Sequence, residues 1–276
     1  MKRIIFVLIF VICIISFSYS QTVNGDTLTV DGKKILKVWG THYERGYATG
    51  YLLGDRIKSL SENYFISYFF FNNAVLYEST RTYYLNNFEV EDKYQNEAQG
   101  IIDGMIYAGI DLYSNTLQRD IDENDILLSN AIIDLLALDE LQRDDESWCS
   151  SLSSWGESTI LDPELNGDLV ITRNMDWTPH NELLENHLLV VHFPIEENET
   201  NWLAFTFPGL FGALSALNED GLCAFMNMGN NNYHPNLNTF HPIFLSIRNG
   251  IETYDYNGDM EINPSDVVDA IQDKYQ

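Results

Sequence analysis

The sequence predicts an α+β fold in which a mainly helical N-terminal part is followed by a strand-rich C-terminal part. Between Glu44 and about Leu141, apolar residues recur at spacings of three and four, the period of an amphipathic helix. From Cys149 onward, short alternating segments are separated by turn residues, as in antiparallel strands. Because the two kinds of segment do not alternate along the chain, a parallel βαβ sheet is not expected. With 45% of its 276 residues hydrophobic, the chain can build a sizeable core.

Strand-forming segments occur on both sides of the helical part. Residues 22–38 alternate polar and apolar side chains around Asp31-Gly32, a dipeptide typical of a two-residue hairpin turn. Further turns are marked by Asn166-Gly167, Pro208-Gly209 and Asn218-Glu219-Asp220-Gly221. We expect the later strands over residues 149–155, 168–173, 187–193, 202–207, 211–217 and 222–227.

The first residues of the chain have the features of an export signal. Lys2 and Arg3 precede an unbroken apolar run over residues 4–15, and small residues follow up to Ser20. This arrangement predicts a signal peptide over residues 1–20 and a secreted mature protein. The apolar run is short for a bilayer span, although an uncleaved N-terminal anchor is the alternative. We expect no membrane association once the signal is removed.

The composition restricts the classes of partner. The chain has 41 acidic and 15 basic residues, a formal net charge of −26 at pH 7. Binding to nucleic-acid phosphates requires clustered Lys and Arg, so no nucleic-acid partner is expected. The six histidines are scattered and form no pair with metal-ligand spacing, so we expect no cofactor for catalysis.

Cys149 stands at the first position of a predicted strand and is the candidate nucleophile. If the chain is cut between Trp148 and Cys149, the new α-amino group lies on the same residue as the thiol. A free cysteine thiol titrates at about 8.5 and an α-amino group at about 8, so the amine can take the thiol proton near neutral pH. Such an N-terminal amine is an accepted catalytic base. A disulfide between Cys149 and Cys223 is the alternative.

Two charged residues on the second strand of the same hairpin are further candidates. Arg173 carries a permanent positive charge that can hold a thiolate or a substrate carboxylate. Asp176 can accept a hydrogen bond from the new ammonium group. A spacing of three residues puts the two on opposite faces of a regular strand, so one of them must lie at a bend or beyond the strand end. An ordinary surface ion pair is the alternative for this pair.

Several motifs in this chain resemble one family. They are Cys149-Ser150-Ser151 with Trp155-Gly156, Arg173-Asn174-Met175-Asp176-Trp177, the segment 40–53 that reads GTHYERGYATGYLL, Pro208-Gly209, Asn218-Glu219-Asp220-Gly221-Leu222, and Asn227. Together, over roughly residues 36–250, they resemble the N-terminal nucleophile (Ntn) hydrolases. The chain is most similar to the isopenicillin-N (penicillin) acyltransferase-like cysteine family. Bile-salt hydrolases and acid ceramidase are more distant relatives that share the Cys and the Arg-Asn-x-Asp motif.

This resemblance implies a four-layer αββα fold, with two packed antiparallel sheets between helical layers. It also implies a precursor that cuts itself between Trp148 and Cys149. Residues 21–148 would then form a helical α chain that stays bound to the catalytic β chain over residues 149–276, as a heterodimer. Family members usually continue for further strands, so the resemblance also implies a C-terminally incomplete sequence.

The resemblance also implies roles for individual residues. Cys149 would be the nucleophile, Arg173 and Asp176 would line the site, and Asn227 would donate its amide to the oxyanion. The reaction would be attack on a non-peptide amide of a small molecule, giving a thioester on Cys149. Water then completes hydrolysis, or an amine completes acyl transfer. The protein is therefore expected to be an amidohydrolase or an N-acyltransferase.

A second motif near the end of the chain has the spacing of a calcium loop. Carboxylate and amide side chains stand where an EF-hand or dockerin-like loop places its oxygen ligands. The candidate ligands of one structural Ca²⁺ are Asp255, Asn257, Asp259, Glu261 and Asp266. Met260 replaces the usual glycine at position 6, and Asp266 replaces a longer glutamate. A chance cluster in so acidic a chain is the alternative.

Two other functions compete with the hydrolase. A papain-like cysteine peptidase would need a Cys-His pair and a Cys-Trp context, which Cys149-Ser150 does not provide. A calcium-stabilised secreted binding module, with a Cys149–Cys223 disulfide, is the non-enzymatic alternative.

Overall fold

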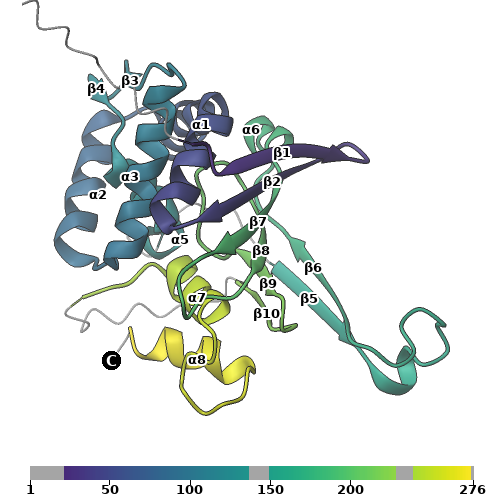
Figure 1. The fold of residues 1–276 in the computed structure, drawn as a ribbon. Helices are drawn as coiled ribbons and strands as arrows, with labels where there is room; N and C mark the ends of the chain where they lie inside the picture. The colour runs from purple at the N-terminus through teal and green to yellow at the C-terminus, as the bar shows by residue number, and fades with distance from the viewer. Residues whose placement is uncertain (1–21, 137–148, 228–238, 275–276) are drawn as a thin grey trace, which may run out of the picture.

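The structure is a computed structural model that describes residues 22–136, 149–227 and 239–274 (Figure 1). The predicted signal peptide over residues 1–20 and Trp148, which precedes the predicted cleavage site, lie outside the described residues. In chain order the elements are β1 (Gly25–Val30), β2 (Lys33–Gly40), α1 (His42–Ser59), the π-helix η1 (Leu60–Phe69), α2 (Ala74–Asn87), α3 (Asp92–Tyr107), β3 (Tyr113–Ser114), β4 (Arg119–Asp120), α4 (Glu123–Asn130), α5 (Ile132–Leu135), β5 (Cys149–Ser154), the 3₁₀ helix η3 (Gly156–Ser158), β6 (Val170–Met175), α6 (Asn181–Glu185), β7 (Leu188–Pro194), β8 (Trp202–Thr206), β9 (Ser215–Asn218), β10 (Cys223–Phe225), α7 (Ile243–Glu252) and α8 (Pro264–Gln272). The α+β prediction is confirmed.

A six-stranded sheet forms the centre of the molecule, in the order β1-β2-β7-β8-β9-β10. The predicted N-terminal hairpin is confirmed: β1 pairs with β2 antiparallel, and Asp31 and Gly32 both have positive φ, as a tight primed turn requires. Strand β2 then pairs with β7 in parallel, from Lys34 opposite Leu188 to Gly40 opposite Pro194. The segments before and after residue 148 therefore share one sheet.

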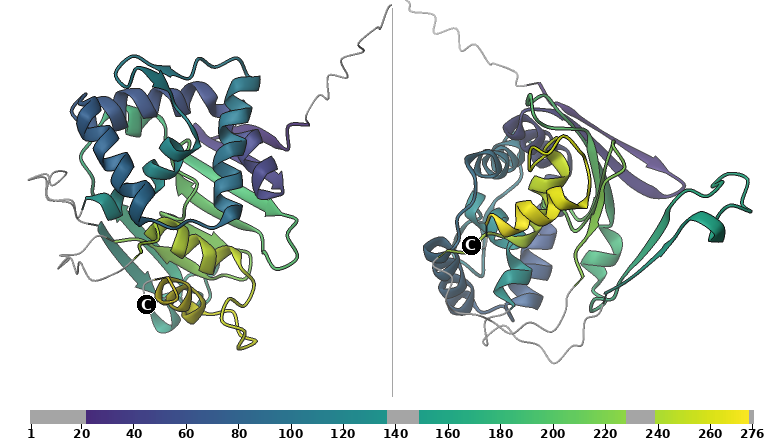
Figure 2. Two further views of the ribbon diagram at one scale, coloured as in Figure 1. Left: turned by 90° about the vertical axis from the view of Figure 1, so that its left-hand side faces the viewer. Right: turned by 90° about the horizontal axis from the view of Figure 1, so that it is seen from below.

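Helices α1, α2, α3, α7 and α8 lie on one side of this sheet (Figures 1 and 2). Thr41 and Glu44 form a capping box that begins α1. Helices α1 and α3 pack at very close range. A Cβ at Gly50 would collide with the carbonyl oxygen of Ile101, so the close packing requires a glycine there. The glycines of the GTHYERGYATGY segment thus have a packing role. None of the helices within residues 22–136, 149–227 and 239–274 combines the length and apolar character that a membrane span needs.

Two predicted strands are shorter than expected: the strand expected over 222–227 covers only Cys223–Phe225, and the strand before it starts late. We expected a strand over 211–217, but β9 begins only at Ser215. The backbone before it has other partners: the amide of Gly212 donates to Asn130 Oδ1 at 2.8 Å, and the amide of Ala213 donates to the carbonyl of Phe244 at 2.9 Å. These bonds to α4 and α7 replace the ladder bonds of a strand. They come from distant parts of the chain, so the local pattern carried no sign of them.

Strands β5 and β6 form a separate two-stranded ribbon that extends away from the body (Figure 1). Its register pairs Cys149 with Met175 and Ser151 with Arg173. The ribbon is antiparallel, as the sequence predicts, and its first residue is the candidate nucleophile. An isolated two-stranded ribbon is marginally stable in water. Arg173 and Ser151 bond to Met226 and Asn227 after β10, so the ribbon is held to the body at its Cys149 end.

Candidate functional site

The β5–β6 ribbon brings the thiol and the predicted arginine together. Alternation along each strand puts Cys149, Ser151, Arg173 and Met175 on one face, because cross-strand partners share a face. Arg173 Nη2 lies 3.2 Å from Cys149 Sγ and also donates to the carbonyl of Met226 at 2.8 Å. The guanidinium therefore connects the candidate nucleophile Cys149 to the residue that follows β10. This is the contact that the sequence led us to expect for Arg173.

Asp176 lies just past the end of β6, which confirms that one member of the Arg173/Asp176 pair is beyond the strand. It follows Met175, the register partner of Cys149, so its backbone is next to the start of β5. Its side chain is exposed. Within residues 149–227 it forms no ion pair with Arg173, so the surface-ion-pair alternative does not describe this pair.

Asn227, which follows β10, contacts the face of the ribbon that carries Cys149. Its Nδ2 donates to Ser151 Oγ at 3.3 Å. Because Met226 accepts from Arg173, the two consecutive residues 226 and 227 both attach to the ribbon beside Cys149. The structure therefore gathers Cys149, Arg173 and Asn227 in one place, with Ser151 between two of them. Ser151 was not among the predicted site residues.

The two described cysteines are both free thiols. Burial raises the pKa of the Cys223 thiol, whereas Cys149 lies beside a guanidinium. A thiolate is the reactive form of cysteine and is stabilised by a neighbouring positive charge. The disulfide between these cysteines, which the non-enzymatic alternative requires, is absent from this structure.

Aromatic side chains of the helical layer pack against the residues that surround the Cys149 thiol. Met175, Trp177 and Met226 pack against a buried cluster that includes Tyr64. Trp177 Nε1 donates to the hydroxyl of Tyr64 at 2.6 Å, and the rings of Tyr64 and Tyr68 are stacked 5.7 Å apart. These tyrosines belong to the π-helix η1, more than eighty residues before Cys149, so sequence reasoning did not connect them with the site.

The calcium-like loop lies between α7 and α8 and is folded partly as the motif requires. Met260, at the position usually held by glycine, has φ 70° and donates its amide to Asp255 Oδ2 at 3.0 Å. Asp266 is buried and accepts from the amides of Asn257 and Asn263. Helix α8 follows the loop, and Asn263 caps it.

One oxygen of this loop has no partner. Asp255 Oδ1 is buried and accepts no hydrogen bond. The side chains of Asn257 and Asp259 are engaged with backbone amides of the loop itself, those of Asp259 and Glu261 respectively. Within the described parts of the chain, the three aspartates of the loop do not bring their oxygens within the 4.8 Å that a shared ion would need. The loop has the ligand types for calcium.

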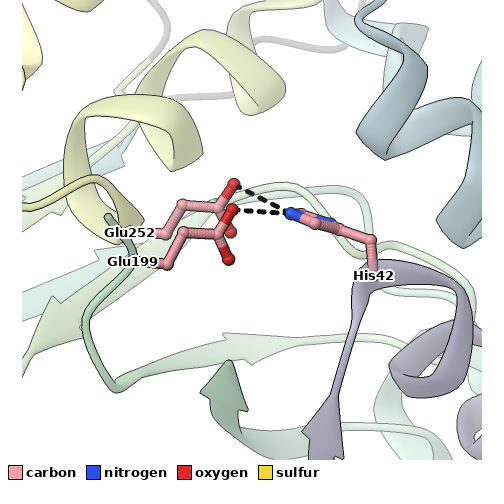
Figure 3. A group of neighbouring side chains, drawn as sticks. All are labelled: His42, Glu199 and Glu252. Atoms are coloured by element: carbon pink, nitrogen blue, oxygen red, sulfur yellow. Dashed lines mark hydrogen bonds and ion pairs between the residues drawn. The ribbon is translucent and has the colours of Figure 1, made fainter. Parts of the chain in front are cut away.

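A second cluster was not predicted from the sequence as a site. His42, at the start of α1, points toward Glu199 and Glu252 (Figure 3). Its Nε2 lies 2.8 Å from Glu199 Oε1, and its Nδ1 lies 2.7 Å from Glu97 Oε2. Arg248 Nη2 donates to Glu97 at 2.7 Å, and its Nε donates to Glu252 at 2.7 Å. We call this cluster the His42 network; its members are His42, Arg45, Lys93, Glu97, Glu196, Glu199, Arg248 and Glu252.

The His42 network joins the segments on either side of residue 148. Arg45 pairs with Glu196 at 2.9 Å and with Glu199 at 3.0 Å, and Arg248 pairs with Glu97 across the same boundary. Four carboxylates face three permanent positive charges, so the network is neutral when His42 is protonated. His42 and Arg45 belong to the GTHYERGYATGY segment, and the charged part of that motif therefore has an assembly role.

His42, Glu199 and Glu252 could also hold a metal ion, because one ligand atom of each lies within 4.8 Å of the others. The charges around these three residues argue against a metal ion. Lys93 Nζ lies 2.9 Å from Glu252 Oε1 and 3.4 Å from Glu199 Oε1, so an ammonium group already faces both carboxylates. The carboxylates are thereby neutralised by the chain's own cations.

We predict that the His42 network weakens as the pH rises. Burial lowers the pKa of His42, but the carboxylates of Glu252, Glu199 and Glu97 outweigh it and raise the pKa overall. A raised pKa in the folded state stabilises the fold below the unfolded value of about 6.5, and this contribution is lost as the pH rises through the folded value. Melting temperatures measured from pH 6 to 9 should therefore fall more steeply for the wild type than for His42→Gln. His187→Gln, at an exposed histidine, should keep the wild-type slope; equal slopes in all three proteins would contradict the prediction.

No protein-family model matches this chain, and no curated protein matches its sequence.

Proposed function

We propose that the protein is a secreted, self-processing cysteine Ntn hydrolase or acyltransferase that acts on a non-peptide amide of a small molecule. The observation that carries this proposal is the 3.2 Å contact between Arg173 Nη2 and Cys149 Sγ at the first residue of β5. A thiol beside a guanidinium, at the start of a strand, suits a nucleophile whose own α-amine becomes the base after cleavage. In the described part of the chain no hydrogen bond joins Cys149 to a histidine, which favours this base over that of a papain-like peptidase.

The proposed reaction has two steps. The α-amine of Cys149 takes the thiol proton, and the sulfur attacks the amide carbonyl while the Asn227 amide donates to the developing oxyanion. The C–N bond then breaks, the amine leaves with the proton, and the acyl group remains on Cys149 as a thioester. Water, or a second amine, attacks the thioester and frees the thiol. Arg173 stabilises the thiolate, and Asp176 orients the ammonium form of the α-amine.

We further propose that the fold is a four-layer αββα sandwich. One face of the six-stranded sheet is not covered by helices and carries apolar side chains, including Phe205, which is 61% exposed, and Trp39, which is 40% exposed. Trp39 pairs with Phe193, which is also exposed, and Phe205 pairs with Leu189 on the same face of β7, so the apolar residues lie on one face of neighbouring strands. A second sheet packed on this face would bury them. This supports a four-layer αββα arrangement to which the β5–β6 ribbon contributes.

Self-cleavage would give two chains that remain associated. Strands β2 and β7 pair across the boundary, and the His42 network adds buried ion pairs across it. We therefore propose an α/β heterodimer of residues 21–148 and 149–276. The net charge of −26 argues against a nucleic-acid partner. The signal-like residues 1–20 support secretion, with no membrane association after their removal.

Intact mass and N-terminal sequencing of the wild-type protein test the proposal. The expected result is two co-purifying chains, one of which begins at Cys149. A single uncut chain with two free thiols would contradict self-processing. An uncut chain two daltons lighter than its sequence would instead indicate a Cys149–Cys223 disulfide and favour the binding module.

We also propose that the loop over residues 255–266 binds one structural Ca²⁺, independently of catalysis. The buried, unpartnered Asp255 Oδ1 is the observation that favours it, because a buried carboxylate oxygen without a partner is costly unless a cation contacts it. Asp255, Asn257, Asp259 and Asp266 would supply side-chain oxygens, and Glu261 would act through its backbone carbonyl at position 7.

Calcium is therefore expected to stabilise the fold. At about 100 times its dissociation constant, Ca²⁺ would add about 2.7 kcal/mol to the free energy of unfolding. Melting curves of the protein in EDTA and in excess CaCl₂ should differ accordingly. Asp255→Asn should lose the difference, whereas Asp168→Asn, an exposed aspartate of the ribbon, should retain it. Identical curves with and without calcium in the wild type would reject the site.

A further inference from the structure

We infer that Ser151 is a positioning residue that fixes the amide of Asn227 at the oxyanion of the reaction. The inference rests on the proposed function, because it assigns a role within the Cys149 site. The observation behind it is the hydrogen bond from Asn227 Nδ2 to Ser151 Oγ, at 3.3 Å.

The geometry of the ribbon puts Ser151 beside the reacting thiol. Cys149 and Ser151 are two residues apart on β5, so their side chains emerge on the same face about 6–7 Å apart. Ser151 is directly opposite Arg173, whose guanidinium contacts the thiol. A group held by Ser151 is therefore within reach of a carbonyl under attack by Cys149.

The backbone that carries Asn227 is fixed from two directions. The amide of Met226 donates to the carbonyl of Leu214 at 3.1 Å, and the carbonyl of Met226 accepts from Arg173 at 2.8 Å. These bonds hold the main chain before Asn227, but they leave its side-chain torsions unconstrained. Among the residues that the structure describes, the bond to Ser151 is the hydrogen bond that constrains the side chain.

The donor count suits this role. The amide nitrogen of asparagine carries two hydrogens, and a serine hydroxyl can accept a hydrogen bond. When one hydrogen is given to Ser151, the second remains available for a substrate oxygen. Oxyanion donors must be positioned before the reaction to be effective, and small displacements in such sites lower rates strongly. Removal of the serine hydroxyl should thus reduce turnover without affecting the thiol itself.

The test compares Ser151→Ala, Ser151→Thr and Ser153→Ala in the self-cleaved protein. The Ser153 side chain lies on the same face of β5, two residues further on, and provides a matched control. Turnover is followed with the 4-nitroanilides of acetic, phenylacetic and dodecanoic acid, which release coloured 4-nitroaniline. We expect Ser151→Ala to lower kcat about 10-fold with KM changed less than about 2-fold. Ser151→Thr, which keeps the hydroxyl, and Ser153→Ala should both stay near the wild type.

A second readout separates positioning from general damage to the site. Alkylation of Cys149 by iodoacetamide passes through no oxyanion, so its rate should be unchanged in Ser151→Ala. In an Asn227→Ala background, Ser151→Ala should cost no further activity, because the group that it positions is already gone. Full activity in Ser151→Ala, slower alkylation, or an undiminished loss in the Asn227→Ala background would each overturn the inference. An uncut wild-type chain with no turnover of any anilide would instead overturn the proposed function.

Discussion

Replacing Cys149 by alanine is expected to leave the chain uncut and to abolish amide hydrolysis. In the proposed function both reactions use Cys149, the first residue of β5, as nucleophile, and Arg173 Nη2 lies 3.2 Å from its sulfur. Alanine removes the attacking atom but keeps the strand, because Cys149 pairs with Met175 through the backbone. Intact mass should give one chain, and turnover of the anilides should fall to the uncatalysed rate.

The matched control for this variant is Cys223→Ala. Cys223 is also a free, half-buried thiol, but burial raises its pKa, and it lies in β10 of the central sheet. Cleavage and turnover should continue in this variant. If Cys223→Ala stopped cleavage while Cys149→Ala did not, Cys223 and not Cys149 would be the nucleophile. If neither variant had an effect, the protein would not be a cysteine hydrolase.

Replacing Arg248 by methionine is expected to destabilise the fold by about 3–5 kcal/mol, since removal of one partner leaves buried charges uncompensated. Arg248 is fully buried, and its guanidinium donates to Glu97, to Glu252 and to the carbonyl of Phe211 at 3.0 Å. It also lies 4.9 Å from the ring of Trp202. Burial raises the pKa values of Glu97 and Glu252, and the charge of Arg248 is the largest of the effects that bring them below the ordinary value, so its loss removes the main compensation for burying these two carboxylates.

Urea unfolding of the uncut Cys149→Ala protein measures this effect, because a single chain unfolds without dissociation. Arg56→Met, at a half-buried position of α1 for which no ion pair is found among the described residues, should change the free energy of unfolding by less than about 0.5 kcal/mol. Addition of Glu97→Gln to Arg248→Met should recover part of the loss, since one unpaired charge is then removed. A loss below about 1 kcal/mol for Arg248→Met would mean that the network contributes little to stability.

The sequence predicted the local features of the fold well. Alternation around Asp31-Gly32 gave the β1–β2 hairpin, because a primed turn needs residues that tolerate positive φ. The start of α8 is also a local feature, because Asn263 and Asp266 cap the helix from within the motif itself. The strand over 211–217 was partly wrong, because its backbone amides bond to α4 and α7 instead of to a neighbouring strand.

The candidate site was predicted only in part, because some of its contacts are local in the sequence and others are not. A thiol at a strand start and an arginine in the partner strand follow from two nearby segments, and the 3.2 Å contact between them agrees with the expectation. The link from Asn227 to Ser151 depends on where β10 ends relative to the ribbon, which no local pattern specifies. The tyrosines of η1 beside Trp177 were not foreseen for the same reason.

The sequence by itself determined the α+β order of elements, the hairpin turn and the residue types at the Cys149 site. The tertiary structure alone decided the parallel pairing of β2 with β7 and the assembly of His42, Glu97, Glu199 and Arg248 into one buried network. Periodicity, turn chemistry and capping act over a few residues, so they can be read from neighbours in the chain. Which distant segments meet is set by packing of the whole core, where a buried charge must find its partner wherever the fold supplies one.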